Sequence, residues 1–454
     1  MSDERTPTTA PETDADGSAL DRFFRLREHA TDVRTEAVAG LTTFLAMAYI
    51  IVVNPGILSE AGMDFGAVFV ATCVAAALGT LIMGLWARYP IAQAPGMGLN
   101  AFFAFTVVLG MGIPWETALA GTFVSGVLFF LLTVSGAREA VVNAIPMQLK
   151  LAVGAGIGIF IAFIGLKNAG IVEAYEPTAV TLGDLTSAAP LLALFGIVVT
   201  GLFLLRGLKG GVFYGIIATA VVGMVVGHVA LPGGIVSAVP SAAPTFGEAF
   251  LAMPELLTVQ MAMVVFTMLF VDFFDTAGTL IAVSNQAGLL DDEGRLPRAN
   301  RALVSDSIAT MGGAAMGTST TTSYIESAAG VGAGGRTGLT SVVTGGLFLL
   351  ALPFFPLIAV LGDHPEITAP ALVIVGVMMA RGLGQIAWDE LEYAIPAFVT
   401  VIAMPLTFSI ANGIALGLFL FPLMMAFKGR IREVHPALFV LAAVFASYFI
   451  WFAE

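Results

Sequence analysis

Apolar runs long enough to cross a lipid bilayer constrain this sequence more than any other feature. A membrane-spanning helix needs about 20 mainly apolar residues, and residues 65–86 and 339–360 form runs of this kind. Only 11% of the 454 residues are charged, whereas soluble domains carry about 25%. The runs are continuous and rich in Gly, Ala and Leu, unlike the alternating pattern of transmembrane strands. The sequence therefore predicts an all-α polytopic membrane protein.

The apolar runs fall into two sets and predict about 14 transmembrane segments. The first set comprises residues 36–58, 65–86, 98–109, 115–134, 149–166, 190–205 and 212–230. The second set comprises residues 259–289, 301–316, 324–331, 339–361, 369–380, 393–408 and 410–427. A further run at 436–452 is either an extra crossing or a helix that lies against the bundle. With the N-terminus inside, only Lys167 of the 19 Lys and Arg residues falls outside, in agreement with the positive-inside rule.

The two sets are similar in sequence, which predicts a repeat. Residues 124–131 (VSGVLFFL) resemble residues 343–350 (VTGGLFLL), and the third segment of each set is short and interrupted. Because an odd number of crossings separates the halves, they have opposite orientations. Inverted repeats with broken helices and a binding site near the membrane midplane are typical of secondary transporters.

A polar, small-residue stretch at 317–335 lies where the membrane should be. Its Ser/Thr run at 318–323, and the counterpart at 92–97 in the first set, are flanked by residues that disfavour helix. Extended backbone in lipid is costly unless its N–H and C=O groups are paired. The two stretches are therefore expected to form short antiparallel strands that pair with each other. Each strand leads into a half-helix whose N-terminal N–H groups point inward.

Ionisable residues within the apolar runs are few, and each is a functional candidate. Asp272 and Asp275 share one side of a helix, and Glu326 follows the Ser/Thr run. With helix N-terminal donors and the Asn100 amide, these carboxylates suit a neutral, flat ligand such as a purine or pyrimidine. An anionic ligand fits less well, because the pocket contains two acids and no basic residue. Other candidate contacts are Thr276, Ser323 and Tyr324, and stacking candidates are Phe102, Phe103, Phe273, Phe274 and Tyr324, although such aromatic residues more often face lipid or core.

Three motifs resemble those of the azaguanine-type purine permeases, a branch of the nucleobase–cation symporters related to xanthine and uracil permeases. They are residues 94–103 (APGMGLNAFF), 274–280 (FDTAGTL) and 317–330 (GTSTTTSYIESAAG). The resemblance implies adenine, guanine or hypoxanthine as substrate, coupling to protons, and a homodimer formed through a gate domain. It matches the family's eighth-segment acid to Asp275, its tenth-segment glutamate to Glu326 and its third-segment asparagine to Asn100.

The same resemblance implies seven plus seven inverted segments arranged as a core domain and a gate domain. The predicted division is a disordered, acidic, cytoplasmic tail at 1–32, core halves at 33–140 and 257–362, and gate halves at 141–256 and 363–454.

The function predicted is import of purine nucleobases by symport with a cation through alternating access, with H⁺ as the expected ion and Na⁺ as the alternative. Burial favours the neutral form of a carboxylic acid, so Asp275, Glu326 and Asp272 are candidates for the coupling proton. The alternatives are a sulfate- or bicarbonate-type anion carrier on the same fold and a xanthine or uracil permease. A channel would need a continuous polar stripe, and a membrane enzyme would need a catalytic or metal cluster. Neither cofactor nor metal site is expected, because the histidines lie at loops or segment ends, at His29, His228, His364 and His435.

The net charge of −13 arises largely from acidic residues in the tail and in loops such as 291–293. An acidic solvent face disfavours nucleic acid as a partner, which leaves the nucleobase and membrane lipid. The acid excess would suit a halophile with a high-salt cytoplasm, or it reflects a few acidic loops that arose by chance. The protein is expected in the cell membrane, with several crossings and a cytoplasmic N-terminus.

Overall fold

Helices make up most of the computed structural model, which describes residues 19–136, 146–291, 293, 295–362, 364–436, 438–439 and 442. In the first half these are α1 (Ala19–Phe24), α2 (Val33–Met47), α3 (Ile50–Glu60), α4 (Phe65–Ile82), η1 (Met83–Ala87), α5 (Met97–Ala101), η2 (Phe102–Gly110), α6 (Trp115–Ser135), α8 (Met147–Asn168), α9 (Ala188–Leu205), α10 (Gly211–Val225), α11 (Glu248–Leu251) and η3 (Met253–Leu256). In the second half they are α12 (Val259–Gln286), α13 (Ala299–Met316), α14 (Ser327–Val331), α15 (Gly338–Ala351), η4 (Leu352–Phe354), α16 (Phe355–Gly362), α17 (Pro365–Met379), η5 (Ala380–Gln385), α18 (Leu391–Leu406), α19 (Ile410–Phe427) and η6 (Ile431–Glu433).

Within the described residues, nine helical spans are long and apolar enough to cross a membrane. Three shorter apolar helices accompany them, at Met97–Gly110, Gly211–Val225 and Leu391–Leu406. Each of the predicted segments contains a described helix, including the short tenth segment, which contains α14. The predicted all-α polytopic fold is confirmed.

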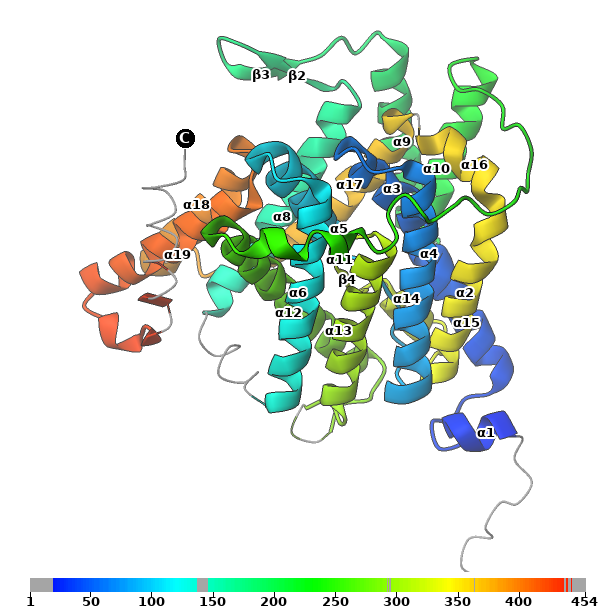
Figure 1. The fold of residues 1–454 in the computed structure, drawn as a ribbon, viewed down its shortest axis with the longest axis horizontal. Helices are drawn as coiled ribbons and strands as arrows, with labels where there is room; N and C mark the ends of the chain where they lie inside the picture. Colours follow the sequence, from blue (N-terminus) through cyan, green and yellow to red (C-terminus); the bar gives the residue numbers. More distant parts are fainter. Residues whose placement is uncertain are drawn as a thin grey trace, which may run out of the picture.

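The helices pack in two groups (Figure 1). In the first group, α13 lies against α4 and α6, and α15 lies against α2 and α4. In the second group, α17 packs on α8, α9 and α10, and α18 packs on α8 and α19. The first group contains helices of the predicted core domain, and the second contains helices of the predicted gate domain. The boundaries of the two domains stay a prediction.

Two antiparallel strands lie at the centre of the first group, as the sequence predicts. Strand β1 (Gln93–Pro95) pairs with β4 (Thr321–Ser323), and all of their residues are buried. The register places Gln93 opposite Ser323 and Pro95 opposite Thr321. Each strand leads into a short helix, α5 after β1 and α14 after β4. The broken helices of the third and tenth segments are therefore confirmed.

The structure corrects one expectation about the ends of the chain. The tail predicted to be disordered at 1–32 contains α1, and Phe24 and Leu26 are buried against Leu339 of α15. Apolar contact orders these residues, although the local composition is polar; residues 1–18 lie outside the described part. The C-terminal run at 436–452 also lies almost entirely outside it.

A β-hairpin that the sequence analysis did not predict projects from one face of the molecule, at the top of Figure 1. It consists of β2 (Val172–Tyr175) and β3 (Ala179–Leu182), and its residues are mostly exposed. The hairpin lies at the opposite end of the molecule from α1. Because nearly all of its residues are exposed, the hairpin lacks the alternation of apolar and polar residues that marks a half-buried strand.

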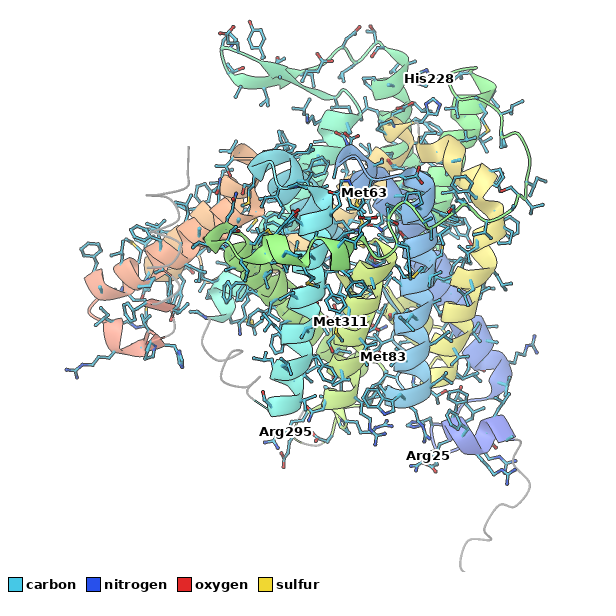
Figure 2. All side chains as sticks on the ribbon, viewed as in Figure 1. Arg25, Met63, Met83, His228, Arg295 and Met311 are labelled. Carbon is cyan, nitrogen blue, oxygen red and sulfur yellow. The ribbon has the colours of Figure 1, made fainter. Side chains whose placement is uncertain are left out.

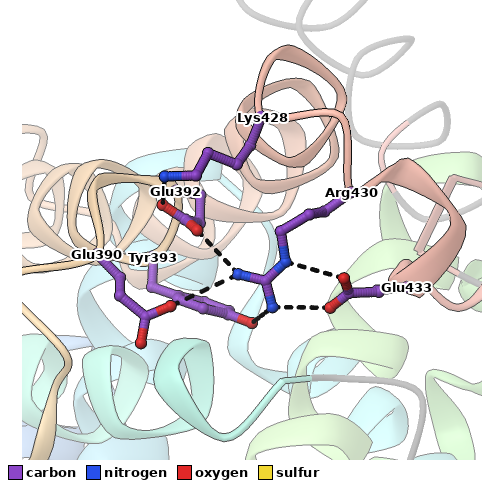
Figure 3. A network of polar contacts seen from close by, with 6 residues as sticks. All are labelled: Glu390, Glu392, Tyr393, Lys428, Arg430 and Glu433. Carbon is purple, nitrogen blue, oxygen red and sulfur yellow. Dashed lines mark hydrogen bonds and ion pairs between the residues drawn. The ribbon is translucent and has the colours of Figure 1, made fainter.

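A polar network joins the start of α18 to the end of α19 (Figure 3). The Arg430 guanidinium donates hydrogen bonds to Glu392 at 2.8 Å and to both carboxylate oxygens of Glu433 at 2.8 and 2.9 Å. Glu390 lies 3.5 Å from Arg430, and Lys428 lies 3.5 Å from Glu392. Hydrogen bonding with Arg430 lowers the pKa of Glu433.

Candidate functional site

The strand pair satisfies backbone groups that would otherwise be unpaired at the interior of the helix bundle. Beyond the strands themselves, the Gly96 N–H donates to the carbonyl of Thr320 at 2.9 Å, and the Tyr324 N–H donates to the carbonyl of Ala92 at 2.9 Å. The Tyr324 hydroxyl donates to the carbonyl of Pro95 at 2.5 Å. The two broken segments are thus fastened to each other by side-chain and backbone bonds.

A buried carboxylate that the sequence analysis missed holds the strand pair from the side. Asp306 on α13 is completely buried and accepts hydrogen bonds from Gln93 at 3.0 Å, Thr276 at 2.7 Å and Ser323 at 2.9 Å. It therefore links β1, β4 and α12. An acid in the middle of a predicted transmembrane segment is the signal that could have identified it.

Close packing around Gly79 of α4 allows this arrangement. A side chain there would place its Cβ 2.6 Å from both Ala309 Cβ and Gln93 Oε1. Small residues of this kind let helices approach closely in membrane proteins. The glycine therefore leaves room for Gln93 to reach Asp306.

Asp272 lies on the same helix as Thr276 and is also buried. One carboxylate oxygen accepts from the Thr310 hydroxyl at 3.2 Å, while the other has no partner among the described residues. Thr276 and Thr322 hydroxyls lie 2.7 Å apart. Either hydroxyl can be the donor in that pair.

Asp275 and Glu326 differ from these internal acids, because both reach the solvent-accessible surface. Glu326 precedes α14, is half-buried and accepts a hydrogen bond from the Tyr49 hydroxyl at 2.5 Å. Tyr49 lies where the first segment breaks between α2 and α3. Asp275 is exposed on α12, has no hydrogen-bond partner among the described residues, and is close enough to Glu326 for their charges to interact.

Asn100 is placed differently from Glu326, its counterpart in the other half. It is fully buried in α5, and its Oδ1 accepts a hydrogen bond from the Ser319 hydroxyl. Its Nδ2 has no partner among the described residues. Asn54 makes a similar internal link, since its Nδ2 donates to Thr72 at 2.7 Å and to Thr318 at 2.8 Å.

The predicted aromatic residues are mostly packed in the protein. Phe102, Phe103 and Phe273 are buried, and Phe273 packs edge-on against Phe129. Phe274 lies 4.5 Å from the Lys150 ammonium, which sits over the ring. α8 therefore brings a basic residue beside Phe274, which precedes Asp275 in the chain.

The structure thus brings every predicted site residue to the junction of α12, β4, α5 and α14. Most of these residues are used inside the protein, and two of them reach the surface. Thr276, Ser323, Tyr324 and Asn100 are engaged in bonds within the protein, as is Asp272. Asp275 and Glu326 present carboxylate oxygens to the surface, where they can accept hydrogen bonds from N–H groups of a ligand.

Sequence comparison identifies the family. The chain matches the permease family over residues 34–416. It belongs to this family. It is 54% identical to the guanine/hypoxanthine permease PbuG of Bacillus subtilis over 438 residues, which cover 94% of this chain and 99% of the relative. It is 44% identical to the adenine permease AdeQ of Escherichia coli over 431 residues, covering 95% and 96%. The resemblance to purine permeases is therefore confirmed.

Structural comparison extends the fold to more distant carriers. The transmembrane domain of the cyanobacterium bicarbonate transporter BicA superposes with a TM-score of 0.59 at 13% identity, covering 84% of this chain and 97% of that chain. At this identity the similarity establishes the shared fold and nothing about the substrate. The permease is thus an integral membrane protein with several crossings and a transporter fold.

Proposed function

We propose that this permease is a secondary active transporter that imports purine nucleobases, namely adenine, guanine or hypoxanthine, across the cell membrane by symport with H⁺. Its N-terminus lies in the cytoplasm in this proposal. The observation that supports it most strongly is the pair of accessible carboxylates, Asp275 and Glu326, at the junction of the broken segments. The purine permeases among its relatives support the same substrate class.

The chemistry of recognition follows from the two carboxylates. A purine has ring N–H and exocyclic amine donors along its edge, and a carboxylate is the strongest acceptor that a side chain offers. Two acids repel an anionic substrate. The neutral nucleobase therefore fits better than sulfate or bicarbonate.

The coupling ion would bind at the same centre. Burial favours the neutral form of a carboxylic acid, and so does a neighbouring negative charge. Asp275 and Glu326 are the first candidates, because they lie close enough for their charges to interact. Asp272 is the third candidate, because one of its oxygens has no partner among the described residues. In this proposal one acid takes up a proton with the substrate and loses it on the opposite side.

Contacts between the two helical groups support alternating access. Near the C-terminal end of α8, Phe408 packs edge-on against Phe105 of the first group and against Phe160 and Phe163 of α8. Lys167 lies 4.9 Å from the same ring. This aromatic cluster joins the two groups, and Asp275 is exposed. In this proposal, Phe105 and Phe408 separate when the site opens to the other side of the membrane. A homodimer through the gate domain is part of the same proposal.

Uptake measurements test the proposal. Cells that lack their own purine carriers would express the wild type, Glu326→Gln and Asp275→Asn, and uptake of labelled adenine, guanine and hypoxanthine would be measured. We expect the wild type to concentrate at least one purine, and both variants to lose uptake at equal membrane abundance. Wild-type uptake in both variants would refute the site assignment.

Competition and ion replacement refine the result. An excess of unlabelled xanthine, uracil, sulfate or bicarbonate should leave purine uptake unchanged; inhibition by one of them would point to that alternative. A protonophore should abolish uptake, and replacement of Na⁺ by K⁺ should not. The reverse pattern would assign Na⁺ as the coupling ion.

A further inference from the structure

Three potential metal ligands meet on the face of the molecule opposite Arg25 and Arg295, where Figure 2 labels His228. His228 Nε2 and His364 Nδ1 each lie 2.9 Å from the same oxygen of Glu366, Oε1. The ligand atoms of the three residues all lie within 4.8 Å of one another. The sequence analysis expected no such cluster, and that expectation is wrong. The reason is separation along the chain, since His228 is 138 residues from Glu366.

The cluster is anchored by well-defined local structure. His228 follows the last turn of α10, and its backbone N–H donates to the carbonyl of Gly223 at 2.9 Å. His364 immediately precedes α17, and Glu366 lies in the first turn of that helix, after Pro365. Since α10 and α17 pack against each other, their ends hold the three side chains in place.

The donor set suits a divalent transition-metal ion. Two imidazole nitrogens and one carboxylate oxygen form a known catalytic zinc ligand set, with a fourth position left for water. Imidazole favours Zn²⁺ and its neighbours over Mg²⁺ or Ca²⁺. Ligand atoms around tetrahedral Zn²⁺ are about 3.4 Å apart, given metal–ligand distances near 2.1 Å. Small side-chain rotations would bring the present group to that spacing.

Access and charge also favour binding. The side chains of His228 and His364 are 32% and 21% exposed, whereas that of Glu366 is only 7% exposed. An ion can therefore reach the imidazoles from solvent and meet a mostly buried carboxylate. A carboxylate only accepts hydrogen bonds, so the two ring nitrogens are its donors in the metal-free state. A bound ion would replace both of those protons.

We propose that His228, His364 and Glu366 form a binding site for one divalent transition-metal ion, of which Zn²⁺ is the best match. The ion would cross-link the end of α10 to the start of α17. These helices come from the first and second halves of the chain, so the site would fasten the two halves of the second helical group together. The proposal does not depend on the transported substrate.

Binding to the purified full-length protein tests the proposal. The protein would carry an affinity tag without histidine, and Co²⁺ would be titrated while the visible absorption bands of the ion are recorded. We expect saturation at one Co²⁺ per chain, loss of the bands when Zn²⁺ is added, and a higher melting temperature with Zn²⁺. His228→Ala and His364→Ala should each weaken binding by more than about tenfold, since even the loss of an outer-shell partner costs 10–100-fold.

His29→Ala is the matched control, because it removes one histidine of the chain outside the cluster. It should bind Co²⁺ as the wild type does. Size-exclusion profiles and metal-free melting temperatures would confirm that both cluster variants fold. Unchanged affinity in folded His228→Ala and His364→Ala, or no saturable binding to the wild type, would overturn the proposal and leave a hydrogen-bonded cluster without a metal.

Discussion

The two broken segments of this permease share a backbone design but differ in how they use it. In the third segment, β1 leads into α5, and its polar residue Asn100 is buried and tied to Ser319. In the tenth segment, β4 leads into α14, and Glu326 stays half-buried with one bond from Tyr49. One segment therefore completes the scaffold, while the other presents an acid.

The difference shows how a repeated fold acquires an asymmetric site. Pairing of β1 with β4 solves the same backbone problem for both halves, since neither strand can remain unpaired in lipid. The side chains are then free to diverge. Internal links from Asn100, Asn54 and Asp306 hold the frame, and the accessible carboxylates are left on the α12 and α14 side.

The most severe test removes the buried acid that fastens the frame. Asp306→Ala leaves the donors of Gln93, Thr276 and Ser323 without their acceptor. Each buried unpaired group costs about 1–3 kcal/mol, so we expect a loss of about 3 kcal/mol or more in stability. Thermal unfolding in detergent would measure it.

Ser307→Ala is the control for that experiment. Ser307 is buried in the same helix, but among the described residues its hydroxyl bonds only to the carbonyl of Val304. It should melt within a few degrees of the wild type. If Asp306→Ala behaves like Ser307→Ala, the acid does not hold the strand pair.

A smaller but more specific effect is expected at the accessible acid. Glu326→Gln should weaken purine binding about 10- to 150-fold, because a hydrogen bond to a charged group contributes about 1.5–3 kcal/mol. Folding should be unaffected, since the shape is kept. Substrate-dependent stabilisation of the purified protein would measure the affinity. Tight binding by a well-folded Glu326→Gln would remove Glu326 from the site.

Asn100→Ala tests the third segment, in the comparison with Glu326 of the tenth segment. It removes the acceptor of Ser319 together with an amide nitrogen that has no partner in the part of the chain that the structure describes. We expect a cost of about 1 kcal/mol in stability and little change in purine affinity. A large loss of affinity at unchanged stability would mean that Asn100 contacts the substrate after a conformational change.

Tyr49→Phe tests whether Glu326 is held in position. The hydroxyl that donates to Glu326 is lost while the buried ring is kept. We expect about a fivefold loss of purine affinity, equivalent to about 1 kcal/mol. In the double variant with Glu326→Gln, the effect of Tyr49→Phe should become smaller. Full additivity would show that Tyr49 acts independently of the acid.

The smallest effect is expected at the partly exposed network of Figure 3. Hydrogen bonding with Arg430 lowers the pKa of Glu433, so this pair stabilises the fold above the ordinary pKa of glutamate and loses that effect as the pH falls through the lowered value. Arg430→Gln should lower the melting temperature slightly at pH 7. The difference from the wild type should shrink in acid, and a difference that grows in acid would contradict this.

The sequence alone determined the membrane fold, the approximate positions of its segments, the strand-forming stretches and three of the four acids discussed around the strand pair, namely Asp272, Asp275 and Glu326. These features are local. A long, continuous apolar run forms a helix in lipid, and an interrupted run must pair its backbone N–H and C=O groups with another segment. The sequence also shows that Asp306 lies within a predicted transmembrane segment. It does not show that Asp306 accepts hydrogen bonds from Gln93, Thr276 and Ser323.

Only the tertiary structure decided which polar residues are used internally and which remain accessible. Nothing local distinguishes Asn100 from Glu326, because their burial depends on Ser319 and Tyr49, which lie 219 and 277 residues away. The same holds for Lys150 beside Phe274 and for the cluster of His228, His364 and Glu366. Contacts between distant segments depend on how whole helices pack, and that packing is not encoded in any single stretch of the chain.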